Sequence, residues 1–101
     1  MTDRELLELA AKAAGLHDQW PEPDYGAEWQ SDEIGIWCFG NGEGVAWNPL
    51  TDDGDALRLA VRMNLWAAVR DGYQHFDSDN DHYEATRRAI VRAAACIGSA
   101  L

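Results

Sequence analysis

The sequence predicts an α+β fold, specifically a three-layer α/β/α sandwich with a four-stranded, mainly antiparallel sheet. Three segments repeat apolar residues at the three- and four-residue spacing of an amphipathic helix. Residues 34–39, IGIWCF, carry apolar side chains on both alternating faces of a strand, and such a strand is normally covered on both faces. We therefore expect the order helix, strand, strand, helix, strand, strand, helix in a single domain over residues 1–101.

The first helix is expected at residues 2–14. Thr2 and Glu5 form a capping box, and Gly15 can adopt the left-handed conformation that ends a helix. The residues expected to face the core are Leu6, Leu9, Ala10 and Ala13. Residues 18–33 follow with two prolines and no period, so we expect an irregular acidic loop there.

The strand at 34–39 is expected to form a hairpin with a short strand at 45–47, because the glycine-rich segment GNGEG separates them. A second helix should run from about residues 51–53 to Met63, and Asn64 can end it. Its expected inner stripe is Leu57, Ala60 and Val61.

The segment LWAAVRDGYQHF, residues 65–76, has an Asp-Gly pair between two strand-length runs. This is the signature of a type I′ hairpin and would supply the third and fourth strands. The last helix is expected to start at Asp81 as its N-cap, with Glu84 three residues later. The residues expected to share its inner face are Tyr83, Ile90, Ala94, Ile97 and Leu101.

Charge is distributed unevenly along the chain. The formal net charge is −10, and no lysine or arginine lies between Lys12 and Arg58. The acids of that interval are Asp18, Glu22, Asp24, Glu28, Asp32, Glu33, Glu43, Asp52, Asp53 and Asp55. This pattern opposes direct binding to nucleic acid or to an anionic membrane and favours a protein partner with a basic surface. A solvated acidic face is the simpler alternative.

Two acidic segments resemble ligand sites only in part. TDDGD at 51–55 is best interpreted as a helix N-terminus, where acids complement the helix dipole. DSDND at 77–81 begins like a calcium loop, but His82 and Arg88 stand where that loop needs glycine and glutamate. No catalytic set has a diagnostic spacing, so we expect no catalytic residues, no metal and no cofactor.

Aromatic residues in the acidic loop are the best candidates for a binding surface. The predicted partner-binding residues are Trp20, Tyr25, Trp29, Asp24, Glu28, Asp32 and Glu33. Aromatic side chains among charges are common at recognition surfaces. The alternative is that the rings fold inward and hold the loop in place.

Three segments resemble the phage ABA sandwich domain family of small phage and prophage proteins: MTDRELLELAAKAAG, WNPLTDDGDALRLAVRMNL and ATRRAIVRAAACIG. The resemblance leaves out the loop at 18–33. It implies an α/β/α sandwich and a phage or prophage origin, and it implies no activity.

We therefore expect a non-enzymatic phage accessory protein in the bacterial cytoplasm that binds a protein through the loop at 18–33. We expect no secretory signal, because the first residues carry acids and no cleavable apolar segment, and we expect no membrane span, because no apolar run is long enough. Its two cysteines, Cys38 and Cys96, are expected to be reduced thiols. One alternative is an acidic mimic of nucleic acid that inhibits a host nuclease or defence complex. The other is a small metal-dependent enzyme that uses residues 77–82.

Overall fold

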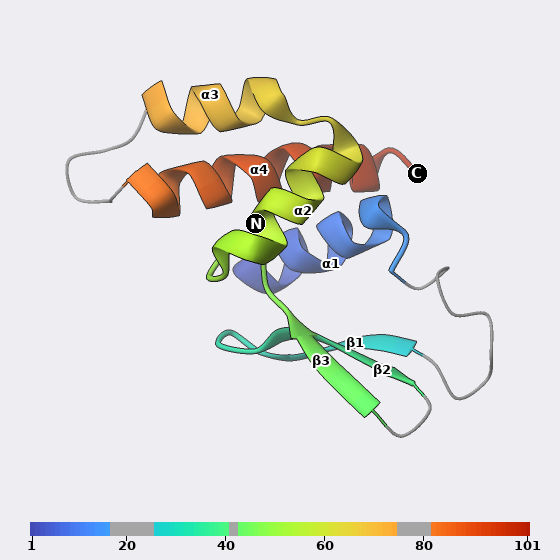
Figure 1. Cartoon of the computed structure of the whole chain (residues 1–101). Helices are drawn as coiled ribbons and strands as arrows, with labels where there is room; N and C mark the ends of the chain where they lie inside the picture. Colours follow the sequence, from blue (N-terminus) through green and yellow to red (C-terminus); the bar gives the residue numbers. More distant parts are fainter. Residues whose placement is uncertain (17–25, 41–42, 75–81) are drawn as a thin grey trace.

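Four helices pack together on one side of a small sheet in the computed structural model, which describes residues 1–16, 26–40, 43–74 and 82–101 (Figure 1). The helices are α1 (Asp3–Ala14), α2 (Asp53–Met63), α3 (Trp66–Gln74) and α4 (His82–Ser99). The strands are β1 (Gly26–Ser31), β2 (Gly35–Gly40) and β3 (Glu43–Trp47). Helix α4 contacts all three other helices, and α1 lies between α4 and the sheet.

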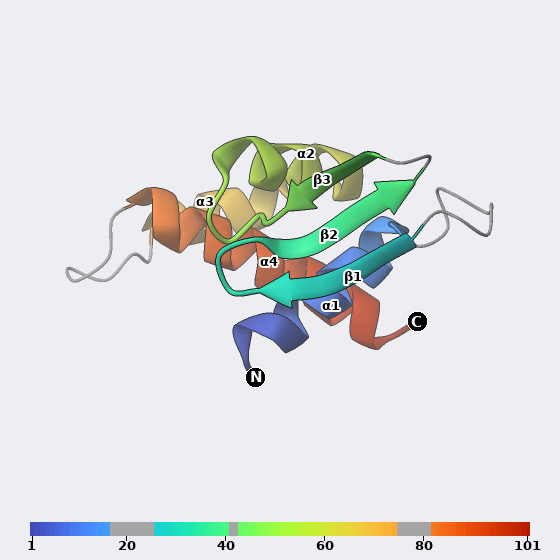
Figure 2. The same ribbon diagram turned by 90° about the horizontal axis from the view of Figure 1, so that it is seen from below.

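The sheet is antiparallel with the order β1-β2-β3. Viewed from below, it lies in front of the helices (Figure 2). Its inner face contributes the buried residues Ala27, Ile36 and Cys38 to the core beside α1. On the opposite face lie Trp37 and Phe39, which alternate with them along β2.

The α+β class is confirmed, but the four-stranded sheet is wrong for the part of the chain that is described: it has three strands. The three-layer sandwich is not confirmed, because every helix formed by the described residues lies on one side of the sheet. Trp37 and Phe39 are half-buried, although no helix among the described residues covers them. Their rings lie against Gly44 and Gly26 of the neighbouring strands, where no side chain intervenes.

The predicted hairpin at 65–76 is wrong, because α3 occupies most of this segment. Leu65 and Val69 follow helical spacing, and Leu65 is buried. Gly72 is the residue that gave the turn signal, and it lies inside α3 where this helix crosses α4. A Cβ at position 72 would lie 2.7 Å from Thr86 Cα and 2.9 Å from Ala89 Cβ. Close helix packing therefore explains the glycine.

The irregular loop predicted at 18–33 is also wrong in part, since residues 26–31 form β1. Ala27 and Trp29 face the helices, whereas Glu28 and Gln30 are exposed. This alternation is a strand pattern that the surrounding glycine and acids obscure. At the next strand, Ile34 lies in the preceding turn and is exposed, so β2 begins at Gly35.

Most of the predicted helix ends are confirmed. Thr2 Oγ1 accepts a hydrogen bond from the Glu5 amide at 3.1 Å, and Gly15 is left-handed with φ 71°. Asp52 caps α2 by accepting from the Asp55 amide at 2.8 Å, and Asn64 ends that helix with φ 55°. The proposed N-cap Asp81 lies outside the described residues.

The helix faces were predicted less well. In α1, Leu6 and Ala10 are buried as expected. The inner stripe of α2 is displaced, because its buried apolar residues are Ala56, Leu59 and Ala60. Leu57 and Val61 are instead 56% and 57% exposed. In α4 the residues Ile90 and Ala94 are buried, but Tyr83, Ile97 and Leu101 are exposed.

Asn48 joins the sheet to the helices at the end of β3. Its side-chain amide donates to the backbone oxygens of Asp32 and Glu33 at 3.0 and 3.2 Å. Its backbone amide donates to Asp55 Oδ2 at 2.9 Å. The buried Asp55 carboxylate also accepts from Arg58 at 2.7 Å. These bonds fix the β1–β2 turn against the start of α2.

The two cysteines are expected to differ in reactivity. Cys38 is buried, and burial together with the Asp55 charge raises the pKa of its thiol above the ordinary value of 9.0. Cys96 is exposed on α4. At pH 8, iodoacetamide should alkylate Cys96 in the native protein and reach Cys38 only after unfolding, as mass spectrometry can show. Equal labelling of both thiols would contradict the burial of Cys38.

The raised pKa also predicts a pH dependence. Because the folded state holds the Cys38 proton more tightly than the unfolded chain, the stabilisation from this thiol is fully present below pH 9.0. It is lost as the pH rises through the folded pKa.

Candidate functional site

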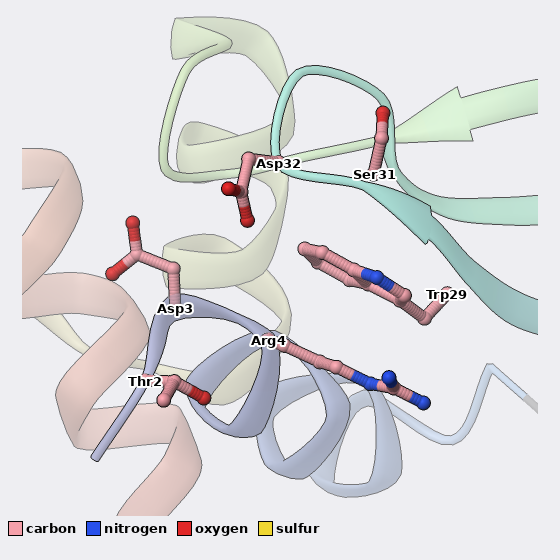
Figure 3. A pocket seen from close by; sticks show the side chains of 6 residues that line it. All are labelled: Thr2, Asp3, Arg4, Trp29, Ser31 and Asp32. Carbon is pink, nitrogen blue, oxygen red and sulfur yellow. The ribbon is translucent and has the colours of Figure 1, made fainter.

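An open cleft lies between the N-terminus of α1 and the end of β1. It has a volume of about 670 Å³. Its lining residues are Thr2, Asp3, Arg4, Trp29, Ser31 and Asp32 (Figure 3). Two of them, Trp29 and Asp32, were predicted from the sequence as partner-binding residues.

Trp29 lines this cleft with part of its ring and packs against the core with the rest. The Arg4 guanidinium lies over the ring at 5.9 Å from its centroid, within reach of a cation–π interaction. Arg4 Nε also donates to Glu8 Oε1 at 2.6 Å. The cation in the cleft is therefore already held by an aromatic ring and a carboxylate.

The two carboxylates of the cleft differ in their partners. Asp3 accepts a hydrogen bond from Arg88 Nη1 at 3.0 Å, so its charge is compensated by α4. Asp32 is exposed in the β1–β2 turn, and no cation of the described chain pairs with it. Asp32 is therefore the carboxylate here that is open to an external cation.

The other acids of the sheet are, like Asp32, exposed and without an ion pair to the described residues. Glu28, Glu33 and Glu43 are exposed and form no ion pair with the residues that the structure describes. No lysine or arginine occurs in the three strands. We call Glu28, Asp32, Glu33 and Glu43 the sheet carboxylates.

The helical side is nearly neutral. The acids of the four helices are Asp3, Glu5, Glu8, Asp53, Asp55, Asp71 and Glu84, and their bases are Arg4, Lys12, Arg58, Arg62, Arg70, Arg87, Arg88 and Arg92. Several of these are paired, such as Arg87 with Asp53 at 2.7 Å. Uncompensated negative charge within the described ranges therefore lies mainly on the sheet side.

The structure describes some of the predicted partner-binding residues and leaves out others. Trp20, Asp24 and Tyr25 lie outside the described residues. Glu28, Asp32 and Glu33 are exposed around the sheet, as a binding role requires. Sequence reasoning missed Asp3 and Arg4, because the packing of α1 beside β1 is a tertiary contact that no local pattern reports.

A second cavity lies among α2, α3 and α4, with a volume of about 840 Å³ and a mostly apolar lining. Leu57, Trp66 and Tyr83 are exposed large side chains at its wall, and His82 also contributes to it. We call this cavity the helical groove. The metal-enzyme alternative used residues 77–82, of which His82 alone is described. The described residues contain no group of three or more metal-ligating side chains.

Comparison with protein-family models, with curated proteins and with solved structures found no match. The resemblance to the phage ABA sandwich family therefore stays a prediction. None of the described helices is long and apolar enough to cross a membrane.

Proposed function

We propose that this protein is a non-enzymatic binding module whose acidic sheet side captures a protein partner that has a basic surface. The observation that supports this proposal is the set of sheet carboxylates: they are exposed and lie beside strands that carry no cation. A surface of this kind attracts a cationic partner over a long range, and within the described residues no ion pair has to be broken to receive it.

The cleft at Trp29 suits a single lysine or arginine side chain of that partner. Asp32 offers an uncompensated acceptor, and the Trp29 ring offers an apolar wall for the methylene groups. Asp3 adds negative charge at the same opening, although Arg88 already holds it.

The same carboxylates also favour a second candidate, a mimic of nucleic acid that occupies the basic cleft of a nuclease or defence complex. The two candidates differ in one respect. A mimic and a DNA duplex compete for one site on the partner, whereas an ordinary acidic docking surface leaves DNA binding unchanged.

A phage or prophage origin and a cytoplasmic location belong to this proposal as well, on the strength of the sequence resemblance. The three-layer sandwich implied by that resemblance would need a further layer over Trp37 and Phe39, the face that the described helices leave open.

We expect the sheet carboxylates to dominate binding of a basic probe. In isothermal titration against a lysine-rich peptide, the triple change Asp32→Asn, Glu33→Gln and Glu43→Gln should weaken binding about tenfold or more, roughly 1.4 kcal/mol. The matched control, Asp53→Asn, Asp71→Asn and Glu84→Gln, changes the net charge equally on the helical side and should weaken it far less.

The second part of this test is the dependence of the binding affinity on salt concentration. Binding should weaken steeply between 0.1 M and 1 M salt, since the Debye length falls from about 10 to about 3 Å. The proposal fails if both triple variants lose affinity equally, or if affinity is insensitive to salt.

A further inference from the structure

The two edges of the sheet differ in how they are protected. Edge strand β1 has a register shift between Trp29 and Ser31 and contacts α1. Edge strand β3 pairs with β2 in an unbroken register, and no described helix packs extensively against it. Residues 43–46 are all exposed.

Strand β3 also lacks the usual features that prevent an edge from pairing. It contains no proline, lysine, arginine or bulge, and its one charge is Glu43 at the first position. The backbone N–H and C=O groups on its outer side therefore face away from β2, and none of the described strands pairs with them.

The side chains of β3 leave room for an additional strand. Val45 lies on the helix-facing side and is 62% exposed. On the other side Gly44 has no side chain, and the Trp37 indole lies over it: a Cβ at position 44 would collide with Cζ2 and lie 2.5 Å from Cε2. The indole thus covers Gly44 on this face of β3.

Negative charge stands at both ends of this apolar strand. Glu43 begins it, and the turn that carries Asp32 and Glu33 is tied to its far end by the Asn48 side chain. Five residues of extended chain span about 14 Å from first to last Cα. The edge therefore presents free backbone groups and exposed Val45 between two carboxylate ends.

We propose that the β3 edge pairs with an extended basic segment of the partner, which adds a fourth strand to the sheet. Its cations would lie near Glu43 and near Asp32 and Glu33, and apolar side chains between them would cover Val45 and the Trp37 indole. This inference rests on the proposed function and specifies its geometry. A second copy of the chain suits the edge less well, because each copy carries a net charge of −10.

The test uses the peptide Lys-Lys-Val-Thr-Val-Lys-Lys and an analogue with N-methyl groups on its three central residues. Both have the same charge, but the analogue lacks the central N–H donors. We expect the analogue to bind at least tenfold more weakly. Amide exchange within residues 43–47 should slow at least tenfold when the first peptide is bound.

A matched pair of variants locates the contact. Val45→Ala should weaken binding several-fold, whereas Val61→Ala, an equally exposed valine on α2, should leave it unchanged. Either change should fold normally, because both side chains are exposed.

The outcomes distinguish strand addition at β3 from the acidic docking surface of the proposed function. Equal binding of both peptides without protection of 43–47 overturns strand addition and leaves the acidic docking surface intact. No binding of either peptide at low salt overturns both proposals. Loss of affinity in Val61→Ala alone would place the site on the exposed face of α2 and overturn the inference. Protection of 43–47 that rises with protein concentration, without peptide, would make the edge a contact between copies and overturn the inference.

Discussion

Replacing Gly98 with alanine is expected to destabilise the fold by about 2–4 kcal/mol. Gly98 is buried in α4 where this helix crosses α1. A Cβ there would collide with the backbone oxygen of Leu9 and lie 2.8 Å from its carbonyl carbon. Backbone atoms in a helix cannot move aside as a flexible side chain can, so the two helices would have to separate. The midpoint of urea unfolding, followed by circular dichroism, measures the loss.

Gly54→Ala is the matched control for this change. Gly54 lies in the first turn of α2, and the nearest atoms to an added Cβ are the ends of the Asp52 and Arg58 side chains, at 3.1 Å or more. Alanine is the better helix former by about 1 kcal/mol, so this variant should be as stable as the wild type or more so. If Gly98→Ala unfolds at the wild-type midpoint, the close crossing of α1 and α4 is wrong.

Replacing Asn48 with alanine should cost about 2–3 kcal/mol. The residue is 4% exposed, and its side chain makes three hydrogen bonds: two to the backbone oxygens of Asp32 and Glu33, and one from the buried Leu50 amide at 3.1 Å. Alanine leaves the Leu50 amide without this acceptor and releases the β1–β2 turn. Chemical denaturation measures the cost.

Asn48→Asp provides the sharper comparison. It keeps the acceptor for Leu50 but replaces the donor by a carboxylate oxygen that faces two carbonyl oxygens, so it should be about as harmful as alanine. Thr51→Ala is the control, because the Thr51 hydroxyl makes a single long contact of 3.5 Å with the Asn48 oxygen. If the Asn48→Asp protein is as stable as the wild type, the hydrogen bonds from Asn48 to the β1–β2 turn contribute little to the stability of the fold.

Local chemistry in the sequence predicted helix ends well. The N-cap of Thr2, the N-terminal acids of α2 and the left-handed Asn64 all depend on contacts within a few residues, and each is present as expected. Of the predicted capping box, the bond from the Glu5 amide to Thr2 is formed, and the Glu5 carboxylate accepts from the Thr2 hydroxyl. The second strand and its hairpin partner were also found, because glycines separate two apolar runs.

The errors arose where distant contacts outweighed local signals. Asp71 and Gly72 carry a strong turn signal, yet the approach of α4 makes this glycine part of a helix crossing. Apolar residues on both faces of β2 suggested a second helical layer, but Trp37 and Phe39 rest against glycines of neighbouring strands. Neither outcome can be read from periodicity, since both depend on which glycine meets which distant residue.

The sequence predicted the negative charge of the candidate site but not its geometry. The acids could be recognised in the interval without lysine or arginine, because charge can be counted from the sequence alone. The role of Arg4 beside Trp29 and of Asn48 behind Asp32 and Glu33 depends on tertiary contacts.

The most direct test of the acidic docking surface is a titration of ¹⁵N-labelled protein with the peptide Lys-Lys-Val-Thr-Val-Lys-Lys, followed by amide chemical shifts. We predict that the largest shifts at low salt fall within residues 28–33 and 43–48, and that α2 and α3 change little. Shifts concentrated at Leu57, Trp66 and Tyr83 would place binding in the helical groove and contradict the proposal.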